Sequence, residues 1–206
     1  MNVIDKETWP RRGHYDFFAP MSDPFYTLTF PVDVTALRAW CRANRQPFYP
    51  AMVYAVTKAM EEVDAFHYKD RDGVIVRHDT LVPSFTDLKP GSELFHIVTL
   101  EAGDEPADFC RRAKEQSAAQ TAFITDGPWD GDQLVYFTCL PWFPVTALKK
   151  REGSESLRLG APGGLGPVGG AGGQTASVSL ELNHRLLDGV HVGKCYEALN
   201  EWMKQL

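Results

Sequence analysis

The segment "LNHRLLDG", residues 182–189, places a histidine and an aspartate four positions apart, directly after the alternating run "ASVSLEL". Such alternation is typical of a β-strand with one buried face, so the imidazole of His184 can point from the end of a strand into a cleft. An imidazole acts as a general base near neutral pH when one ring nitrogen is free and the other is held in a fixed tautomer. Asp188 can orient His184 directly, or pin the turn by pairing with an arginine elsewhere, and Gly189 permits a tight backbone path.

The same motif also fits a purely structural role. In that alternative, His184 is a hydrogen-bonded histidine at a strand end and Asp188 is the N-cap of a helix. HxxxDG is a short motif, and short motifs recur by chance. The elements around the motif and the remainder of the chain must therefore decide between the two interpretations.

Hydrophobic spacing predicts strands and helices that alternate irregularly along the chain. Strands are expected within residues 26–35, 74–88 (one or two strands), 93–102, 132–139 and 176–184, the first of them despite Pro31. Helices are expected within residues 33–45, 48–63, 105–122 and 189–206. The last helix should bury one face made of Val192, Cys195, Tyr196, Leu199 and Met203. With several antiparallel strands and no internal repeat, the pattern favours an α/β layered domain over a doubly wound one.

The segment "REGSESLRLGAPGGLGPVGGAGGQ", residues 151–174, is dense in glycine. Glycine loses the most backbone freedom on folding, so we expect a mobile connector before the last strand. A phosphate-binding loop is the alternative, but the GxxxxGK[ST] spacing and the strand–loop–helix frame of such loops are missing.

Length and composition limit the class of protein. The chain has 206 residues, with 44% hydrophobic and 23% charged, which predicts one globular domain over residues 1–206. A formal net charge of -6 with both signs intermixed argues against nucleic acid as a partner. No window approaches a membrane span, and the N-terminus lacks the apolar core of a signal peptide. The four scattered cysteines form no CxxC pair, so we expect reduced thiols in a cytoplasmic protein.

At four places the chain resembles the chloramphenicol acetyltransferases. The stretch "NHRLLDGVHVGKCYEALNEW" resembles their C-terminal signature HHxxxDGxHVxR, and "ETWPRRGHYDFF" resembles their N-terminal W-x-R-[RK]-E-H-F-E-x-F. "FYPAMVYAVTKAMEEVDAFHYKDRDGVIVRHDTLVPSFTD" resembles their central block, and "LPWFPVTAL" resembles their [AN]-[LN]-P-W-[VF]-x-F-x-S-F segment. The four blocks lie in the family's order and cover most of the chain, which makes the resemblance specific.

The resemblance implies a fold, an assembly and a reaction. The implied fold is a two-layer α/β sandwich with helices packed on a mixed β-sheet. The implied assembly is a cytoplasmic homotrimer whose catalytic sites lie at subunit interfaces. The implied reaction transfers an acetyl group from acetyl-CoA to a hydroxyl of chloramphenicol or a similar small acceptor, with no acyl-enzyme and no metal. A thioester is already activated, so positioning and one base can supply much of the rate.

The resemblance also implies residue roles at the matching positions. His184 matches the general base, which takes the proton of the acceptor hydroxyl as its oxygen attacks the thioester. Asp188 matches a structural aspartate that pairs with the arginine matching Arg11, and this pair holds the histidine turn. Phe17 and Phe18 fall where the family places aromatic contacts to the acceptor, although such a pair taken alone would be assigned to the core.

The other histidines receive no catalytic role. His14 and His191 lie within the family's conserved blocks and are expected to be structural hydrogen-bonding groups. His67, His78 and His96 show no metal-ligand spacing, so no metal site is predicted.

The chain departs from the family pattern at several positions. Ala147 aligns with the family serine that donates to the oxyanion, and losing such a donor typically costs about 100-fold or more in rate. Thr146 is adjacent and can supply a hydroxyl only if the local register differs. The glycine-rich segment 151–174 replaces a stretch that lines the family's substrate tunnel, Asn183 replaces a first histidine, and Phe18 stands where tyrosine is common.

Two alternatives remain at the level of sequence. Arg185 gives "NHRLLDG" a likeness to the [DS]HRxxDG motif of dihydrolipoamide acyltransferases, although the chain shows no lipoyl domain. The departures at Ala147 and in the glycine-rich segment fit a trimeric ligand-binding protein that has lost efficient catalysis.

Overall fold

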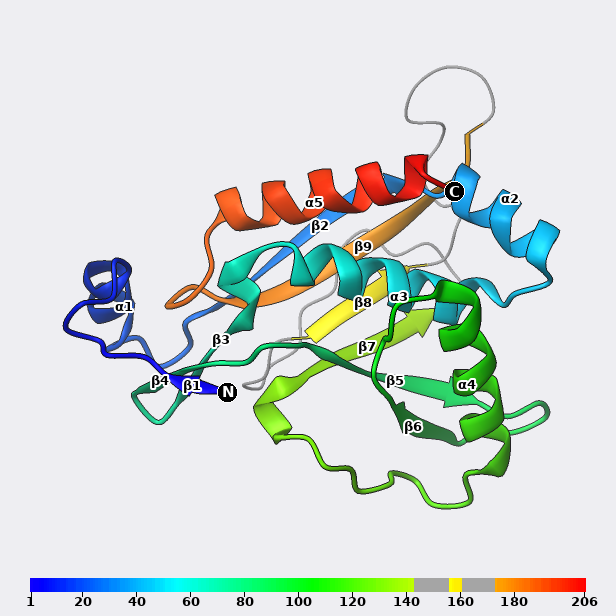
Figure 1. The fold of residues 1–206 in the computed structure, drawn as a ribbon, viewed down its shortest axis with the longest axis horizontal. Helices are drawn as coiled ribbons and strands as arrows, with labels where there is room; N and C mark the ends of the chain where they lie inside the picture. Colours follow the sequence, from blue (N-terminus) through cyan, green and yellow to red (C-terminus); the bar gives the residue numbers. More distant parts are fainter. Residues whose placement is uncertain (143–155, 161–172) are drawn as a thin grey trace.

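The computed structural model describes residues 1–142, 156–160 and 173–206 (Figure 1). In this part of the chain, the larger of two sheets has six strands in the spatial order β2-β9-β8-β7-β5-β6. Their bounds are β2 Phe25–Asp33, β5 Val82–Leu88, β6 Phe95–Thr99, β7 Leu134–Leu140, β8 Ser156–Gly160 and β9 Thr175–Asn183. β5, β7 and β8 pair in parallel and the remaining neighbours are antiparallel, which confirms the predicted mixed sheet.

Helices pack on this sheet and complete the predicted α/β sandwich (Figure 1). Their bounds are α2 Thr35–Asn44, α3 Phe48–Glu61, α4 Pro106–Ala119 and α5 Gly189–Lys204. α3 contacts α4, α5, β5 and β7, and nine of its 14 residues are buried. A helix that is apolar almost all round belongs in the middle of a core. Pro50 lies in the first turn of α3, where a missing N–H leaves no intrahelical bond unmade.

The edge position of β2 explains why the strand tolerates Pro31. β2 pairs with β9 along its whole length, and Pro31 lies opposite Ser177. A proline cannot donate to a β-ladder, but an edge strand needs donors on one side only. Asp33 ends this strand, and its carboxylate accepts the backbone N–H of Thr35 at 2.9 Å as α2 begins.

A second sheet and a short helix lie at one end of the molecule (Figure 1). The sheet has the order β1-β4-β3, with β1 Asn2–Val3, β3 Tyr68–Arg71 and β4 Val74–Arg77, and all its pairs are antiparallel. The helix is α1, Arg12–Phe18, and it precedes β2. Two 3-10 turns, η1 Asp64–His67 and η2 Gly131–Gln133, complete the described elements.

Two expectations from the sequence are wrong. The glycine-rich segment is not only a connector, because β8 lies within it and pairs with β7 on one side and β9 on the other. Hydrogen bonds on both edges favour a strand whose side-chain pattern is weak. Residues 151–155 and 161–172 lie outside the described residues. Tyr196 does not lie on the buried face of α5, since it is 38% exposed and meets Phe30 edge-on at the rim.

Among the described residues, none of the helices combines the length and the apolar character that a membrane span requires.

Candidate active site

β9 delivers His184 to the surface through a compact turn. All nine residues of β9 are buried, and the strand ends at Asn183. The Asn183 side-chain oxygen accepts the Arg185 backbone N–H at 3.0 Å. The backbone carbonyl of Asn183 accepts the N–H groups of Leu186 and Leu187. The backbone N–H of His184 donates to the Pro24 carbonyl at 2.8 Å, which anchors the turn to the start of β2. The position of His184 is therefore fixed by backbone contacts.

Two aromatic rings contact the imidazole of His184. The Phe18 ring stacks on it with a centroid separation of 4.2 Å and an interplanar angle of 16°. The Tyr26 ring lies 4.6 Å away at a tilt of 43°. The His184 side chain remains 38% exposed, so the ring is held by apolar contacts and is still open to a substrate.

The two nitrogens of this imidazole have different surroundings. Nδ1 is buried and lies 3.1 Å from Asp188 Oδ1, but the contact lacks the alignment of a hydrogen bond. The carboxylate is therefore a neighbouring negative charge rather than a hydrogen-bond acceptor for the ring. Burial of Nδ1 leaves Nε2 as the nitrogen available for proton transfer to or from a substrate.

Arg11 binds both Asp188 and the backbone of the histidine turn. Its guanidinium donates to the two Asp188 carboxylate oxygens at 2.5 and 2.8 Å, a bidentate pair. It also donates to the carbonyls of Arg185 at 2.9 Å and His184 at 3.1 Å. Hydrogen bonding from Arg11 lowers the pKa of Asp188 below its ordinary value. The structure thus brings Arg11 and Asp188 together, and Asp188 engages the arginine more closely than the imidazole.

Asp188 is also the N-cap residue of α5, as the structural alternative for the motif had it. The Asp188 backbone N–H donates to Nδ1 of His191 at 2.9 Å, one arm of a capping box. Burial and the charge of Arg11 lower the pKa of His191. Helix capping and the ion pair are therefore built on the same aspartate.

The remaining residues singled out in the sequence lie in different settings. Phe17 is 69% exposed and packs edge-on against Phe18. His14 is exposed on α1 and its side chain makes no hydrogen bond in the described structure, whereas His191 has the expected structural role. Gly189 has an ordinary φ, and a Cβ added to it would meet no described atom within 4 Å, so the backbone does not require glycine there. Thr146 and Ala147 lie outside the described residues.

Two residues at the site carry no signal in the sequence motifs. Tyr26 reaches the histidine because β2 pairs with β9, and its hydroxyl donates to the Leu187 carbonyl at 3.3 Å. Asp70, on β3, pairs with Arg185 at 3.1 Å. The alternation of β2 could have indicated Tyr26, because it lies opposite Leu182 near the strand end, but only the folded chain brings Asp70 to the turn.

Two further features lie away from His184. His78, Asp130 and Asp132 have ligand-type atoms within 4.8 Å of one another, but Arg71 pairs with both carboxylates. A cavity of about 1280 Å³ between α4 and β5 is lined by residues that include Tyr49 and Asp87. Neither feature includes the residues of the histidine turn.

Comparison with known proteins places the chain in one family. The family profile described as chloramphenicol acetyltransferase matches residues 1–153. A chloramphenicol acetyltransferase of Klebsiella sp is 21% identical over 97% of this chain and 92% of its own, and chloramphenicol acetyltransferase 3 of Escherichia coli is 22% identical over 96% and 94%. A solved chloramphenicol acetyltransferase superposes with a TM-score of 0.85 at 20% identity, covering 98% of this chain and 99% of that one.

Dihydrolipoamide acetyltransferases share the fold more distantly. The enzyme from Azotobacter vinelandii has a TM-score of 0.71 at 15% identity, covering 93% of this chain and 85% of that one. The profile match, by contrast, spans well over half of the chain and includes Arg11. The chain therefore belongs to the chloramphenicol acetyltransferase family of acyltransferases.

Proposed function

We propose that this chain transfers an acetyl group from acetyl-CoA to a hydroxyl of chloramphenicol or a similar small acceptor, with His184 as the general base. The observation that carries the proposal is the imidazole of His184, which is fixed in place and still accessible from solvent. Its Nδ1 is buried beside Asp188, its ring is stacked on Phe18, and more than a third of its side chain is exposed. Family membership supplies the reaction class.

The proposed chemistry needs one proton carrier. Nε2 of His184 takes the proton of the acceptor hydroxyl while the hydroxyl oxygen attacks the thioester carbonyl carbon. The tetrahedral intermediate then collapses, the carbon–sulfur bond breaks, and the imidazolium returns its proton to the CoA sulfur. The Asp188 carboxylate beside Nδ1 stabilises the transient positive charge, and Arg11 keeps that carboxylate in place.

The direct test is thiol release from acetyl-CoA with chloramphenicol as the acceptor. We expect acceptor-dependent release by the wild type, and loss of about 10²–10⁴-fold in kcat for His184→Ala, the range for a removed general base. His14→Ala is the matched control, because His14 is an exposed histidine whose side chain has no hydrogen-bond partner in the described structure. Normal turnover by His184→Ala would remove His184 from the mechanism.

A second candidate acceptor is the thiol of dihydrolipoamide. Arg185 and the fold shared with dihydrolipoamide acetyltransferases favour it. Acetyl transfer to dihydrolipoamide, with none to chloramphenicol, would establish this alternative.

A third candidate is ligand binding without efficient turnover, motivated by Ala147 at the position of the family's oxyanion serine. Tight binding of chloramphenicol with no product in a long incubation would favour this candidate over the first. We further propose that the chain works as a homotrimer, with each site shared between two subunits.

A further inference from the structure

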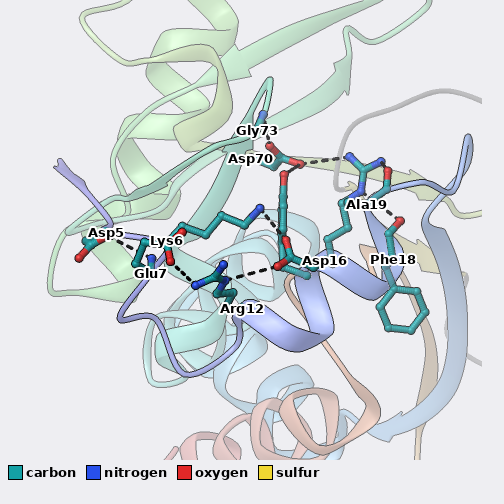
Figure 2. Close-up of polar contacts among 11 residues, drawn as sticks. Asp5, Lys6, Glu7, Arg12, Asp16, Phe18, Ala19, Asp70 and Gly73 are labelled. Carbon is teal, nitrogen blue, oxygen red and sulfur yellow. Dashed lines mark hydrogen bonds and ion pairs between the residues drawn. The ribbon is translucent and has the colours of Figure 1, made fainter.

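The side chain of Arg185 connects the histidine turn to the end of α1. Its guanidinium donates to the Ala19 carbonyl at 2.8 Å, and its Nε lies 3.5 Å from the Phe18 carbonyl (Figure 2). It also donates to the Met21 carbonyl at 3.1 Å. The last carbonyls of a helix have no intrahelical partner, and a cation there also complements the helix dipole. Arg185 therefore caps the C-terminal end of α1, where Phe18 is the last helical residue.

Asp70 holds the same guanidinium from the opposite side. Its carboxylate accepts from Arg185 at 3.1 Å, from the Tyr15 hydroxyl at 3.0 Å and from the Gly73 backbone N–H at 2.8 Å (Figure 2). The Asp70 side chain is only 8% exposed, and a polar group so far from water is costly to bury unless it is hydrogen-bonded. Burial and Asp70 raise the pKa of Tyr15 to about 12, so its hydroxyl remains a donor at neutral pH.

These contacts form a closed path to the proposed base. Arg185 follows His184 in the chain, its guanidinium binds the backbone around Phe18, and the Phe18 ring stacks on the His184 ring. The path differs from that of Arg11, which binds Asp188 and the turn backbone and makes no contact with α1 carbonyls near Phe18 in the described structure. Arg11 therefore holds the backbone of the histidine turn, whereas Arg185 holds the segment that carries Phe18, whose ring stacks on the imidazole.

We propose that Arg185 and Asp70 are positioning residues for His184, which set the orientation of its imidazole by holding Phe18 against it. The catalytic half of this inference rests on the proposed function of His184 as a base. The structural half, the dependence of the ring stack on Arg185, does not.

Arg185→Lys is the first variant. A lysine retains the charge that faces Asp70, but a single ammonium cannot reach the carboxylate and two carbonyls in the planar geometry of a guanidinium. Asp70→Asn is the second variant, because it keeps the shape and removes the charge. Arg12→Lys is the matched control. Arg12 lies on α1, the helix that carries Phe18, but it pairs at the surface with Glu7 and Asp16 (Figure 2).

A double-mutant cycle with Phe18→Leu tests the route through Phe18. We expect Arg185→Lys to lower kcat about 10- to 100-fold with KM for acetyl-CoA unchanged, since a misplaced group of about 1 Å costs up to about 10² in rate. In the Phe18→Leu background the same change should have little further effect. Additive losses would overturn the proposal, and so would a loss of the same size in Arg12→Lys.

Proton NMR of the His184 ring tests the structural half without any turnover. Ring protons that lie over a phenyl group resonate upfield, and the His184→Ala spectrum identifies which signals to follow. We expect the upfield shift to fall in Phe18→Leu to the part that Tyr26 contributes, to shrink in Arg185→Lys and Asp70→Asn, and to persist in Arg12→Lys. An unchanged shift in Arg185→Lys would overturn the inference, whether or not the wild type is active.

The two assays together separate this inference from the proposed function. A wild type without acetyl transfer to any acceptor, but with an Arg185-dependent ring shift, would refute the proposed function and leave the structural half standing. An active wild type whose Arg185→Lys variant loses the ring shift but keeps its kcat would refute the positioning role alone.

Discussion

His184 is supported by two arginines whose side chains cross between the same two segments. Arg11 extends from the N-terminal segment to the turn after β9, and Arg185 extends from that turn back to the N-terminal segment. Each guanidinium binds one carboxylate and at least two backbone carbonyls. Such an arrangement fixes orientation as well as charge, because the donors of a guanidinium lie in one plane. Lysine should be a poor substitute at either position.

Arg11→Lys should separate positioning from charge. A lysine can remain near Asp188, but it loses the bidentate contact and the contacts to the His184 and Arg185 carbonyls. We expect kcat to fall by about 10-fold or more and the free energy of unfolding to fall by about 1–2 kcal/mol. Steady-state kinetics and chemical denaturation measure the two effects. Arg111→Lys, at an exposed pair on α4, is the control, and an equal loss of kcat in both variants would contradict the argument.

The limits of sequence reasoning at this scale are visible in two aspartates. The pairing of Asp188 with Arg11 is predictable only because the two positions match a family pattern, since nothing in the spacing of residues so far apart indicates contact. Asp70 attracts no attention in the sequence, because "KDRDG" is an ordinary hairpin sequence. The ion pair between the buried Asp70 carboxylate and Arg185 becomes apparent only in the folded chain, where β3 lies beside the histidine turn.

At the scale of elements, the N-terminus of α5 contains a group that must stay neutral. Nδ1 of His191 accepts the Asp188 backbone N–H, and a protonated ring could not accept it. The ring faces Arg11, Asp188 and Lys194, and its folded-state pKa lies below the ordinary value of 6.5. The unfolded chain therefore binds more protons in the window just below pH 6.5, so the free energy of unfolding should fall as pH falls through it.

His191→Gln isolates this contribution. Glutamine at the third helical position accepts the same backbone N–H in a capping box, but it does not titrate. We expect the variant to unfold like the wild type at about pH 8, and the stability difference between them to shift in favour of the variant as pH is lowered to about 5. Urea denaturation across that pH range measures the difference. A difference that is constant with pH would exclude His191 as the source.

A buried hydrogen-bond chain ties α4 to the outer strands of the larger sheet. Ser117 on α4 donates to Asp87 of β5 at 2.5 Å and lies 2.9 Å from Nε2 of His96 on β6. Ser117→Ala would remove this hydroxyl from buried His96 and from partly buried Asp87, at a cost of about 1–3 kcal/mol in the free energy of unfolding. Ser92→Ala, in a surface turn, is the control. Equal thermal and chemical stability of the two variants would show that the chain of hydrogen bonds contributes nothing.

Elements with a long amphipathic pattern were predictable, and short or exposed ones were not. β9 alternates over nine residues, and α5 places Val192, Cys195 and Leu199 on one buried face. α1 has only Tyr15 buried among seven residues, and β1 consists of two exposed residues, so neither offers a period to detect. α1 carries Phe18 and helps to complete the surroundings of His184, which is why the sequence indicated the position of His184 better than that of the residues around it.

At the scale of the whole molecule, the fold alone does not determine which acceptor receives the acetyl group. The chain superposes on both chloramphenicol and dihydrolipoamide acetyltransferases, and related folds support different chemistry through the groups at the site. The exposed Phe17 lies next to Phe18, which stacks on His184. Phe17→Ala should therefore raise KM for a hydrophobic acceptor several-fold while leaving KM for acetyl-CoA and the unfolding free energy unchanged. Unchanged KM for every acceptor tested would place Phe17 outside the acceptor pocket.

The exposure of apolar side chains around the histidine turn also bears on assembly. Phe17 is 69% exposed and Val190, in the first turn of α5, is 60% exposed, and neighbouring exposed apolar groups of this kind are typical of an interaction surface. A neighbouring subunit would cover such groups and complete the pocket. We expect light scattering to give three times the chain mass of 23.0 kDa, and specific activity to fall on dilution in step with dissociation. A monomer with full activity would require each chain to hold a complete site, and would refute the shared one.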